Sequence, residues 1–139
     1  MGLNLQSYKG AELISSLDDA IKDGYDEYAK SYYDRSKLVM HAGKAPAVFH
    51  VKTLTPNQLD LLDGIIVGRV RDRECLRLAL RSIEGLEVGD LPVGELPRSP
   101  QNGIVLVDRE WFDDKLGRYT DLMSELASMV MRLSSPDPT

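Results

Sequence analysis

The sequence has little cysteine and no long apolar run. Its one cysteine, Cys75, excludes an intramolecular disulfide and favours a reducing compartment, with the cytoplasm as the default. Because Cys75 borders an apolar helical stripe, we interpret it as a core residue rather than as a reactive thiol. No segment approaches the roughly 20 apolar residues that span a bilayer, and the N-terminus lacks the pattern of a secretory signal. Neither membrane insertion nor export is expected.

Motifs for catalysis and metal binding are also missing. His41 and His50 are the two histidines, and neither a His-x-x-x-His nor a Cys-x-x-Cys spacing adds the further ligands that a metal needs, although the two could be cross-strand neighbours. There is no P-loop, no dinucleotide fingerprint and no Gly-x-Ser-x-Gly elbow. The adjacent Asp18 and Asp19 would point about 100 degrees apart on a helix, which makes a poor catalytic pair. The sequence therefore predicts no enzyme, no cofactor and no metal.

The composition is that of an ordinary folded protein. With 139 residues, 42% of them hydrophobic and 28% charged, the chain is long enough for one domain spanning residues 1–139. A net charge of −5 argues against general nucleic-acid binding, which requires a basic surface. Residues 1–10 and 134–139 carry little pattern and are expected to form a flexible arm and a flexible tail.

The stretch from Leu54 to Gly85 organises the predicted fold. It begins with a strong helix start, because Thr55 can cap the first turn and Gln58 can complete a capping box. Gly64 and Gly68 predict a break that divides the stretch into two helices. The second helix is expected at about 72–83. The first is expected to be largely buried through a broad apolar face, which consists of Leu59, Leu61, Leu62, Ile65 and Ile66.

The remaining elements predict an α+β fold that is mainly α. Apolar spacing over 11–21 indicates an amphipathic helix, and that over 119–133 a stronger one. Residues 37–41 and 47–54 indicate one small antiparallel hairpin, with Phe49 and Val51 on its core face. Four or five helices in all are expected around this hairpin.

The segment 86–103 is rich in proline and glycine, and is therefore expected to be a loop. A loop of this length is often functional, although it might instead wrap along the body of the domain. After it, residues 104–107 predict a brief strand, and Asp108 is a suitable cap for a short helix.

Arginines repeat at helical spacing in the second central helix. Arg73, Arg77 and Arg81 lie four residues apart and would form a ladder along one side. One interpretation is a solvated face whose guanidinium groups pair with local acids. The other is a contact for an acidic partner or a phosphate, because guanidinium offers bidentate donors.

Tyrosines and methionines offer two more candidate contact surfaces. The tyrosines could either pack on the domain or bind a partner through one helix face, and the methionines could either deepen the core or form an adaptable surface. These candidates are Tyr25, Tyr28, Tyr32 and Tyr33 in the N-terminal region, and Met123 and Met131 in the last helix.

Three segments, VFHVKTLT, CLRLALRSIEGL and ELASMVMRLSS, occur in an order that resembles small tailed-phage morphogenesis proteins, particularly the tail-assembly-chaperone-like group. The resemblance spans about residues 37–86 and 119–135. It implies a non-enzymatic protein of the host cytoplasm that binds other virion proteins during tail assembly. The alternatives are a structural component of the virion, at its neck, tail or capsid, and a small phage-encoded inhibitor or regulator of a host protein. Oligomer formation stays open.

Overall fold

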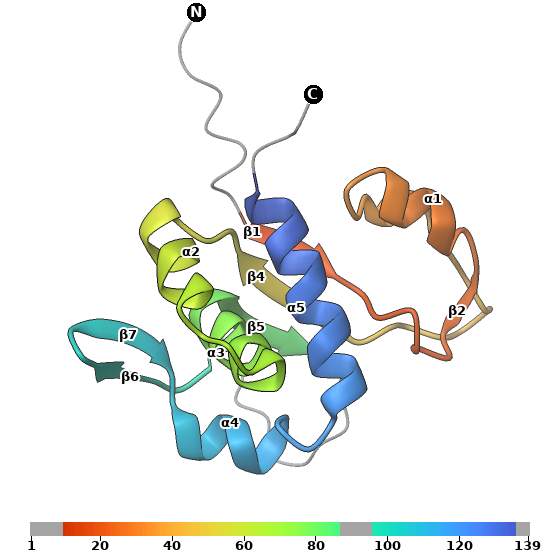
Figure 1. Cartoon of the computed structure of the whole chain (residues 1–139). Coiled ribbons are helices and arrows are strands. Elements are labelled where there is room, and N and C mark those ends of the chain that lie inside the picture. The colour runs from red at the N-terminus through yellow and green to blue at the C-terminus, as the bar shows by residue number, and fades with distance from the viewer. Residues whose placement is uncertain (1–9, 87–95, 136–139) are drawn as a thin grey trace, which may run out of the picture.

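The structure is a computed structural model that describes residues 10–86 and 96–135. These residues form an α+β fold in which α3 (Gly68–Ala79) and α5 (Thr120–Ser134) cover one face of an antiparallel sheet (Figure 1). The sheet has the strand order β1-β4-β5 and consists of β1 (Gly10–Leu13), β4 (Val48–Lys52) and β5 (Leu80–Glu84). The α+β prediction is confirmed, but strands take a larger part in the fold than the sequence indicated.

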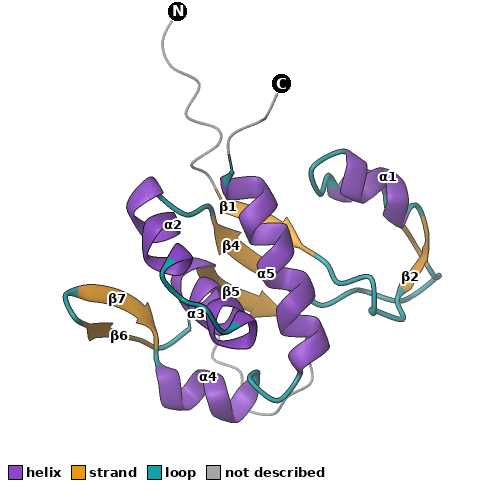
Figure 2. Ribbon diagram, in the orientation of Figure 1, coloured by secondary structure: helices purple, strands orange, loops and turns teal. Residues whose placement is uncertain are grey.

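The other elements surround this helix-on-sheet core (Figure 2). Two further pairs of strands are antiparallel: β2 (Ile21–Asp23) with β3 (Val39–Met40), and β6 (Arg98–Gln101) with β7 (Ile104–Val107). The remaining helices are α1 (Tyr25–Lys30), a single turn of 3₁₀ helix (Arg35–Lys37), α2 (Pro56–Asp63) and α4 (Arg109–Lys115). In the described part of the chain, no helix combines the length and the apolar content of a membrane span.

The central strand β4 confirms the strand predicted within 47–54. Phe49 pairs with Leu13 of β1 on one side and with Ile83 of β5 on the other, and all three side chains are buried. Val51 is buried on the same face. The alternation of a strand therefore turns Phe49 and Val51 toward the helices, as predicted.

Two predictions for the N-terminal third are wrong. The strand at 39–40 pairs with β2 and not with β4, so the predicted hairpin of 37–41 with 47–54 does not form. The predicted helix at 11–21 is instead strand β1 followed by turns. Asp18 explains part of this outcome, because its carboxylate accepts hydrogen bonds from the backbone N–H groups of Ala20 (2.9 Å) and Ala47 (2.8 Å), and so stabilises a turn.

The start of α2 is as predicted. The hydroxyl of Thr55 accepts from the N–H of Gln58 at 3.2 Å, and the Gln58 side chain accepts from the N–H of Thr55 at 2.9 Å, which completes the capping box. The break between Gly64 and Gly68 is also confirmed.

The second central helix ends earlier than predicted, at Ala79 rather than near residue 83. Residues 80–84 become β5 because the sheet needs a second partner for β4. Arg98 supports this change of direction, since its guanidinium donates to the carbonyl oxygens of Leu80 at 2.8 Å and Leu78 at 3.3 Å. It thereby satisfies acceptors that the end of the helix leaves open.

The predicted loop 86–103 is only partly described, and residues 98–101 contradict it by forming β6. Asn102 and Gly103 connect β6 to β7 with φ values of 53° and 80°, as a two-residue hairpin turn of type I′ requires. The brief strand at 104–107, the Asp108 cap and the last helix are confirmed. The predicted arm and tail lie outside the described residues, except that Gly10 begins β1, Ser134 ends α5 and Ser135 caps it.

A small lobe, residues 21–40, lies beside α5 (Figure 1). Its centre is the buried Tyr28, whose hydroxyl accepts from the N–H of Ile14 at 2.9 Å and donates to the carbonyl of Glu12 at 3.1 Å. The guanidinium carbon of Arg132, on α5, lies 4.5 Å from the centre of the Tyr32 ring, which fastens the lobe to the last helix.

Candidate binding groove

A groove of about 690 Å³ lies between the first half of α3, the end of α4 and the start of α5. We call it the α3–α4 groove. Its floor is apolar, because the buried Phe112 and Met123 meet there. Its rim carries three arginines: Arg69, Arg73 and Arg118.

Local sequence explains why these side chains meet. Arg69 and Arg73 are four residues apart on α3, so they lie on one side of that helix. The chain turns sharply after α4, where the N–H groups of Leu116 and Gly117 both donate to the carbonyl of Phe112. A Cβ at Gly117 would lie 3.1 Å from the Cα of Asp113, so this close approach favours glycine. The turn positions the start of α5 against α3.

The acids of the groove are already engaged. Asp113 forms an ion pair with Arg109, with 3.7 Å between Oδ2 and Nε. Burial raises the pKa of the Asp72 carboxyl, against the opposing effects of Arg71 and of a hydrogen bond with Ser124 of α5. Asp113 therefore has a cationic partner, and Asp72 has a hydrogen-bond partner in Ser124.

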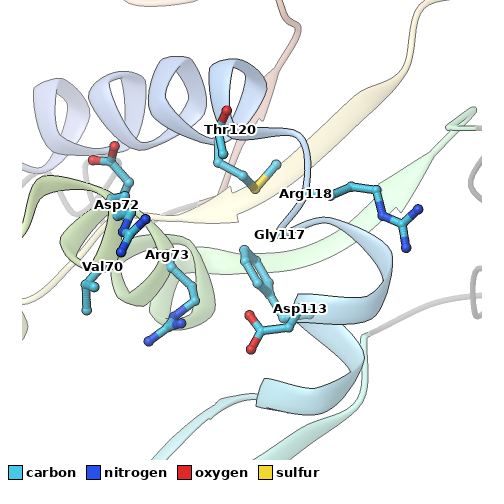
Figure 3. A pocket seen from close by; sticks show the side chains of 10 residues that line it. Val70, Asp72, Arg73, Asp113, Gly117, Arg118 and Thr120 are labelled. Carbon is cyan, nitrogen blue, oxygen red and sulfur yellow. The ribbon is translucent and has the colours of Figure 1, made fainter.

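The arginines of the rim differ in their partners. Nε of Arg73 lies 3.2 Å from Oε1 of Glu74, whereas Arg69 and Arg118 are exposed and form no ion pair with a described residue. Figure 3 shows Arg73 and Asp113 on opposite walls of the groove, while Arg118 extends outward from the turn between α4 and α5. The rim therefore has an excess of positive charge, although the whole chain is acidic.

An exposed apolar surface lies where α2 meets α3. The side chains of Ile66, Val67 and Leu61 are 92%, 51% and 50% exposed, and we call them the α2–α3 joint. The predicted burial of the apolar face is wrong for Leu61 and Ile66, whereas Leu62 is buried and Leu59 and Ile65 pack partly buried against the core. The helix stops before Gly64, so Ile66 and Val67 leave the helical period that would have carried them into the core.

The joint is held in place by α3. Nε of Arg71 donates to the carbonyl oxygen of Ile65 at 3.2 Å, and the N–H of Ile65 donates to the carbonyl of Leu62 at 3.0 Å. Because Val67 is followed directly by α3, the joint continues into the wall of the α3–α4 groove at Arg69. The joint and the first basic residue of the groove are therefore neighbours along the chain.

The predicted arginine ladder does not form. Arg73 lies on the groove, but Arg77 is 1% exposed, and Arg81 belongs to β5 because α3 has already ended. Arg77 donates from Nη1 to Glu74 at 2.8 Å and from Nε to the carbonyl of Val107 at 2.9 Å. It is a buried structural residue, so the interpretation as a contact for a partner is wrong for Arg77.

The tyrosines do not share one helix face. α1 ends at Lys30, and Tyr32 and Tyr33 follow it with φ values of 53° and 65°. Tyr28 is buried and burial raises its pKa to about 12; Tyr25 is half-buried, and burial likewise raises its pKa above the ordinary value. Of the four, Tyr32 is the most exposed, and its ring is in contact with Arg132.

The two methionines, which were expected either to deepen the core or to form an adaptable contact surface, differ in their burial. Met123 is buried in the floor of the α3–α4 groove, whereas Met131 is half-buried at the edge of the core. Met123 therefore contributes to the core and to the groove at once. The core interpretation is the better one for its side chain.

The described residues offer little for covalent or metal chemistry. Cys75 is buried, as predicted, and burial raises the pKa of its thiol to about 12, so the thiol is protonated at neutral pH. His41 and His50 are not cross-strand neighbours, because β3 and β4 do not pair. Among residues 10–86 and 96–135, no group of three or more His, Cys, Asp or Glu side chains could hold a metal ion.

Sequence reasoning missed Arg118 and the exposure of the joint. Both follow glycines: Arg118 comes directly after Gly117, and the joint lies between Gly64 and Gly68. Gly64 and Gly68 predict a helix break, but a break also indicates that the next side chains leave the apolar stripe. That signal was sufficient to predict that Ile66 and Val67 are exposed.

The groove and the joint together suit a protein segment that carries acidic residues around an apolar anchor. Apolar contact would supply affinity, and the arginines would select the sign of the partner's charge. The chain was compared with protein-family models, with curated proteins and with solved structures. None of the three comparisons found a match.

Proposed function

We propose that the chain is a non-enzymatic binding protein that contacts another virion protein during assembly of a tailed-phage particle. The observation that carries the proposal is the exposed α2–α3 joint, where Ile66 is 92% exposed beside Leu61 and Val67. Burying an aliphatic side chain of this size is worth about 1.5–3 kcal/mol. A partner that covers the joint would gain this free energy, which favours a protein interface at this surface.

The resemblance to tail-assembly-chaperone-like proteins involves the same region. The segment VFHVKTLT ends at Thr55, which caps α2, and the joint follows at the other end of this helix. The segment CLRLALRSIEGL begins within α3, whose first turns line the groove. The part of the chain that resembles the group therefore includes the elements that present the joint.

The proposed partner is a segment of a virion protein with apolar side chains flanked by acids. Its apolar side chains would cover Ile66 and Val67, and its acids would meet Arg69 and Arg118 at the groove. Such binding takes place in the host cytoplasm while the particle is built.

The proposal is tested by replacing Ile66 in a tagged copy of the full chain produced in cells that make the phage. We expect the wild-type chain to co-purify with a particle protein identified by mass spectrometry. Ile66→Asp should reduce the recovered partner at least tenfold, because an ionised carboxylate cannot be buried against an apolar anchor. Leu17→Asp is the matched control, since Leu17 is also exposed but lies outside the joint.

A photo-crosslinking residue at position 66 adds a direct readout of contact. Crosslinks from position 66, but not from position 17, to the same particle protein support the proposal. Equal recovery of the partner by wild type and Ile66→Asp, with both chains folded by circular dichroism, would show that the joint is not the interface. Mass spectrometry of purified particles separates an assembly factor, which is absent from them, from a structural component, which is present.

A further inference from the structure

Arg81 differs from the two other arginines that lie near it in the fold. Arg77 donates to Glu74 and to Val107, and Arg98 donates to the carbonyls that end α3. Nε of Arg81 is buried and has no hydrogen-bond partner in the described residues, and within that part of the chain Arg81 lacks the Nη donations that Arg98 makes. No ion pair links Arg81 to an acid in that part of the chain either. A partly buried guanidinium without an anion is unfavourable, which makes this position informative.

A β-bulge places Arg81 in this position. Val51 of β4 pairs with Leu80, and the preceding His50 pairs with Ser82, so Arg81 is the extra residue of β5. A bulge redirects the side chain of the extra residue out of the regular alternation of the strand. The backbone of Arg81 is also fixed, because its carbonyl accepts from the N–H of Leu96 at 2.9 Å.

The side chain of Arg81 lines a pocket of about 500 Å³ that also includes Gly10, Glu12, His50 and Lys52. His50 and Lys52 alternate with the buried Val51, so they lie on the face of the sheet opposite to α3 and α5. Gly10 is the cross-strand partner of Lys52, and it adds no side chain beside the lysine. The pocket therefore stays open beside Lys52.

The charges around the pocket leave a positive excess. The one acid in the lining, Glu12, forms an ion pair with Arg35 at 3.4 Å. His50 lies 3.2 Å from Glu84, measured from Nε2 to Oε1. Lys52 is exposed, and neither it nor Arg81 forms an ion pair with a described residue. Two cations therefore lack a counter-charge in one pocket.

We infer that this pocket binds the phosphate group of a small phosphorylated ligand, held by Arg81 and Lys52. Arginine supplies two parallel N–H donors that match two oxygens of a phosphate, and lysine adds a point charge. The volume lies at the lower end of the range for small-molecule sites. The pocket lies on the other side of the sheet from α3, so this inference does not depend on the proposed function of the joint.

The test measures thermal unfolding of the full chain in inorganic phosphate and in sodium chloride of equal ionic strength. We expect phosphate at about ten times its dissociation constant to raise the melting temperature of the wild type by about 4 °C relative to chloride. Arg81→Met keeps an apolar stem of similar length and removes the charge. We expect it to abolish the response to phosphate, while its melting temperature in chloride is equal to or above that of the wild type, since an unpaired buried charge is gone.

Two further variants keep the result interpretable. Because Lys52 is exposed, Lys52→Met should fold even if Arg81→Met does not. We expect Lys52→Met to weaken phosphate binding about fivefold in calorimetric titration. Arg109→Met also removes one positive charge, but from α4, and should bind phosphate as the wild type does. The inference is overturned if the wild type responds equally to phosphate and chloride, or if Lys52→Met and Arg109→Met bind phosphate equally.

Discussion

Replacing Arg77 should destabilise the domain more than replacing any exposed arginine. Arg77 is 1% exposed, and its guanidinium donates to Glu74 at 2.8 Å, to the carbonyl of Val107 at 2.9 Å and to the Gln101 side chain at 3.1 Å. These bonds connect α3 with the β6–β7 hairpin. Arg77→Met removes all of them and leaves the carboxylate of Glu74 with only the partly exposed Arg73, whose Nε lies 3.2 Å from Oε1.

The size of the effect follows from this geometry. Breaking a buried ion pair by removing one partner typically costs about 3–5 kcal/mol. The side chain of Glu74 is still 18% exposed, so water can solvate it in part and the lower end applies, about 3 kcal/mol. For a chain of 139 residues, 1 kcal/mol corresponds to roughly 3 °C, so the melting temperature should fall by about 10 °C.

The assay is urea and thermal unfolding followed by circular dichroism, on the wild type, Arg77→Met, Glu74→Gln and the double variant. The double variant should be more stable than the sum of the two single losses predicts, by about 1–2 kcal/mol, because it contains no Glu74 carboxylate that has lost its buried cation. Arg109→Met is the control, since its exposed pair with Asp113 should contribute less than about 0.5 kcal/mol. A loss below 1 kcal/mol in Arg77→Met, or strict additivity, would refute this reasoning.

Three other predictions concern single side chains. The thiol of Cys75, buried and with its pKa raised to about 12, should react with a disulfide reagent only at the rate of global unfolding, and rapid labelling of the native chain would contradict its placement in the core. Burial raises the pKa of Tyr28 to about 12, while an unfolded tyrosine ionises near 10. As the pH rises, Tyr28 therefore loses its proton first in the unfolded state, and the free energy of unfolding should fall by up to about 1.4 kcal/mol per pH unit between these two pKa values. The fall should be less steep in Tyr28→Phe. If Tyr28→Phe leaves the slope unchanged, Tyr28 is not its source. Gly103→Ala should destabilise by about 1 kcal/mol because φ is +80°, whereas Gly68→Ala, at an open position in α3, should stabilise; equal melting temperatures in the two would argue against the type I′ turn.

Signals confined to a few neighbouring residues were read correctly from the sequence. The capping box at Thr55, the cap at Asp108 and the break before Gly68 each depend on side chains within about one helical turn. The turn at Asn102-Gly103 is a signal of the same kind, and it was overlooked within the proline-rich segment. Short-range chemistry was therefore sufficient for these features.

Pairing between distant strands was not predictable in the same way. β4 takes β1 and β5 as neighbours, and both segments had helical apolar spacing in the sequence. The free energy gained by pairing with β4 outweighs a helical preference of a few tenths of a kcal/mol per residue. For the same reason Arg81 left the predicted ladder when residues 80–84 joined the sheet.

How well the candidate site residues were predicted depended on how well the helices and strands that carry them were predicted. Arg73 lies on the surface of the groove, although α3 begins at Gly68 and not near residue 72 as predicted. The joint was misplaced into the core, because the apolar pattern was extended across the break before Gly68. Arg81 lacks an ion-pair partner in the described residues because of a β-bulge, and no local pattern in the sequence predicts this bulge.

The position of α5 has a consequence for the order in which the chain can fold during synthesis. This last helix packs on α3, and the hydroxyl of Ser134 accepts from the N–H of Leu54, 80 residues earlier. The ribosome makes the chain from its N-terminus to its C-terminus, so the segments that form β1, β4 and β5 are complete while α5 is still being made. Until α5 is made, part of the apolar face of the sheet has no cover, and a nascent chain stalled before residue 120 would be a substrate for chaperones.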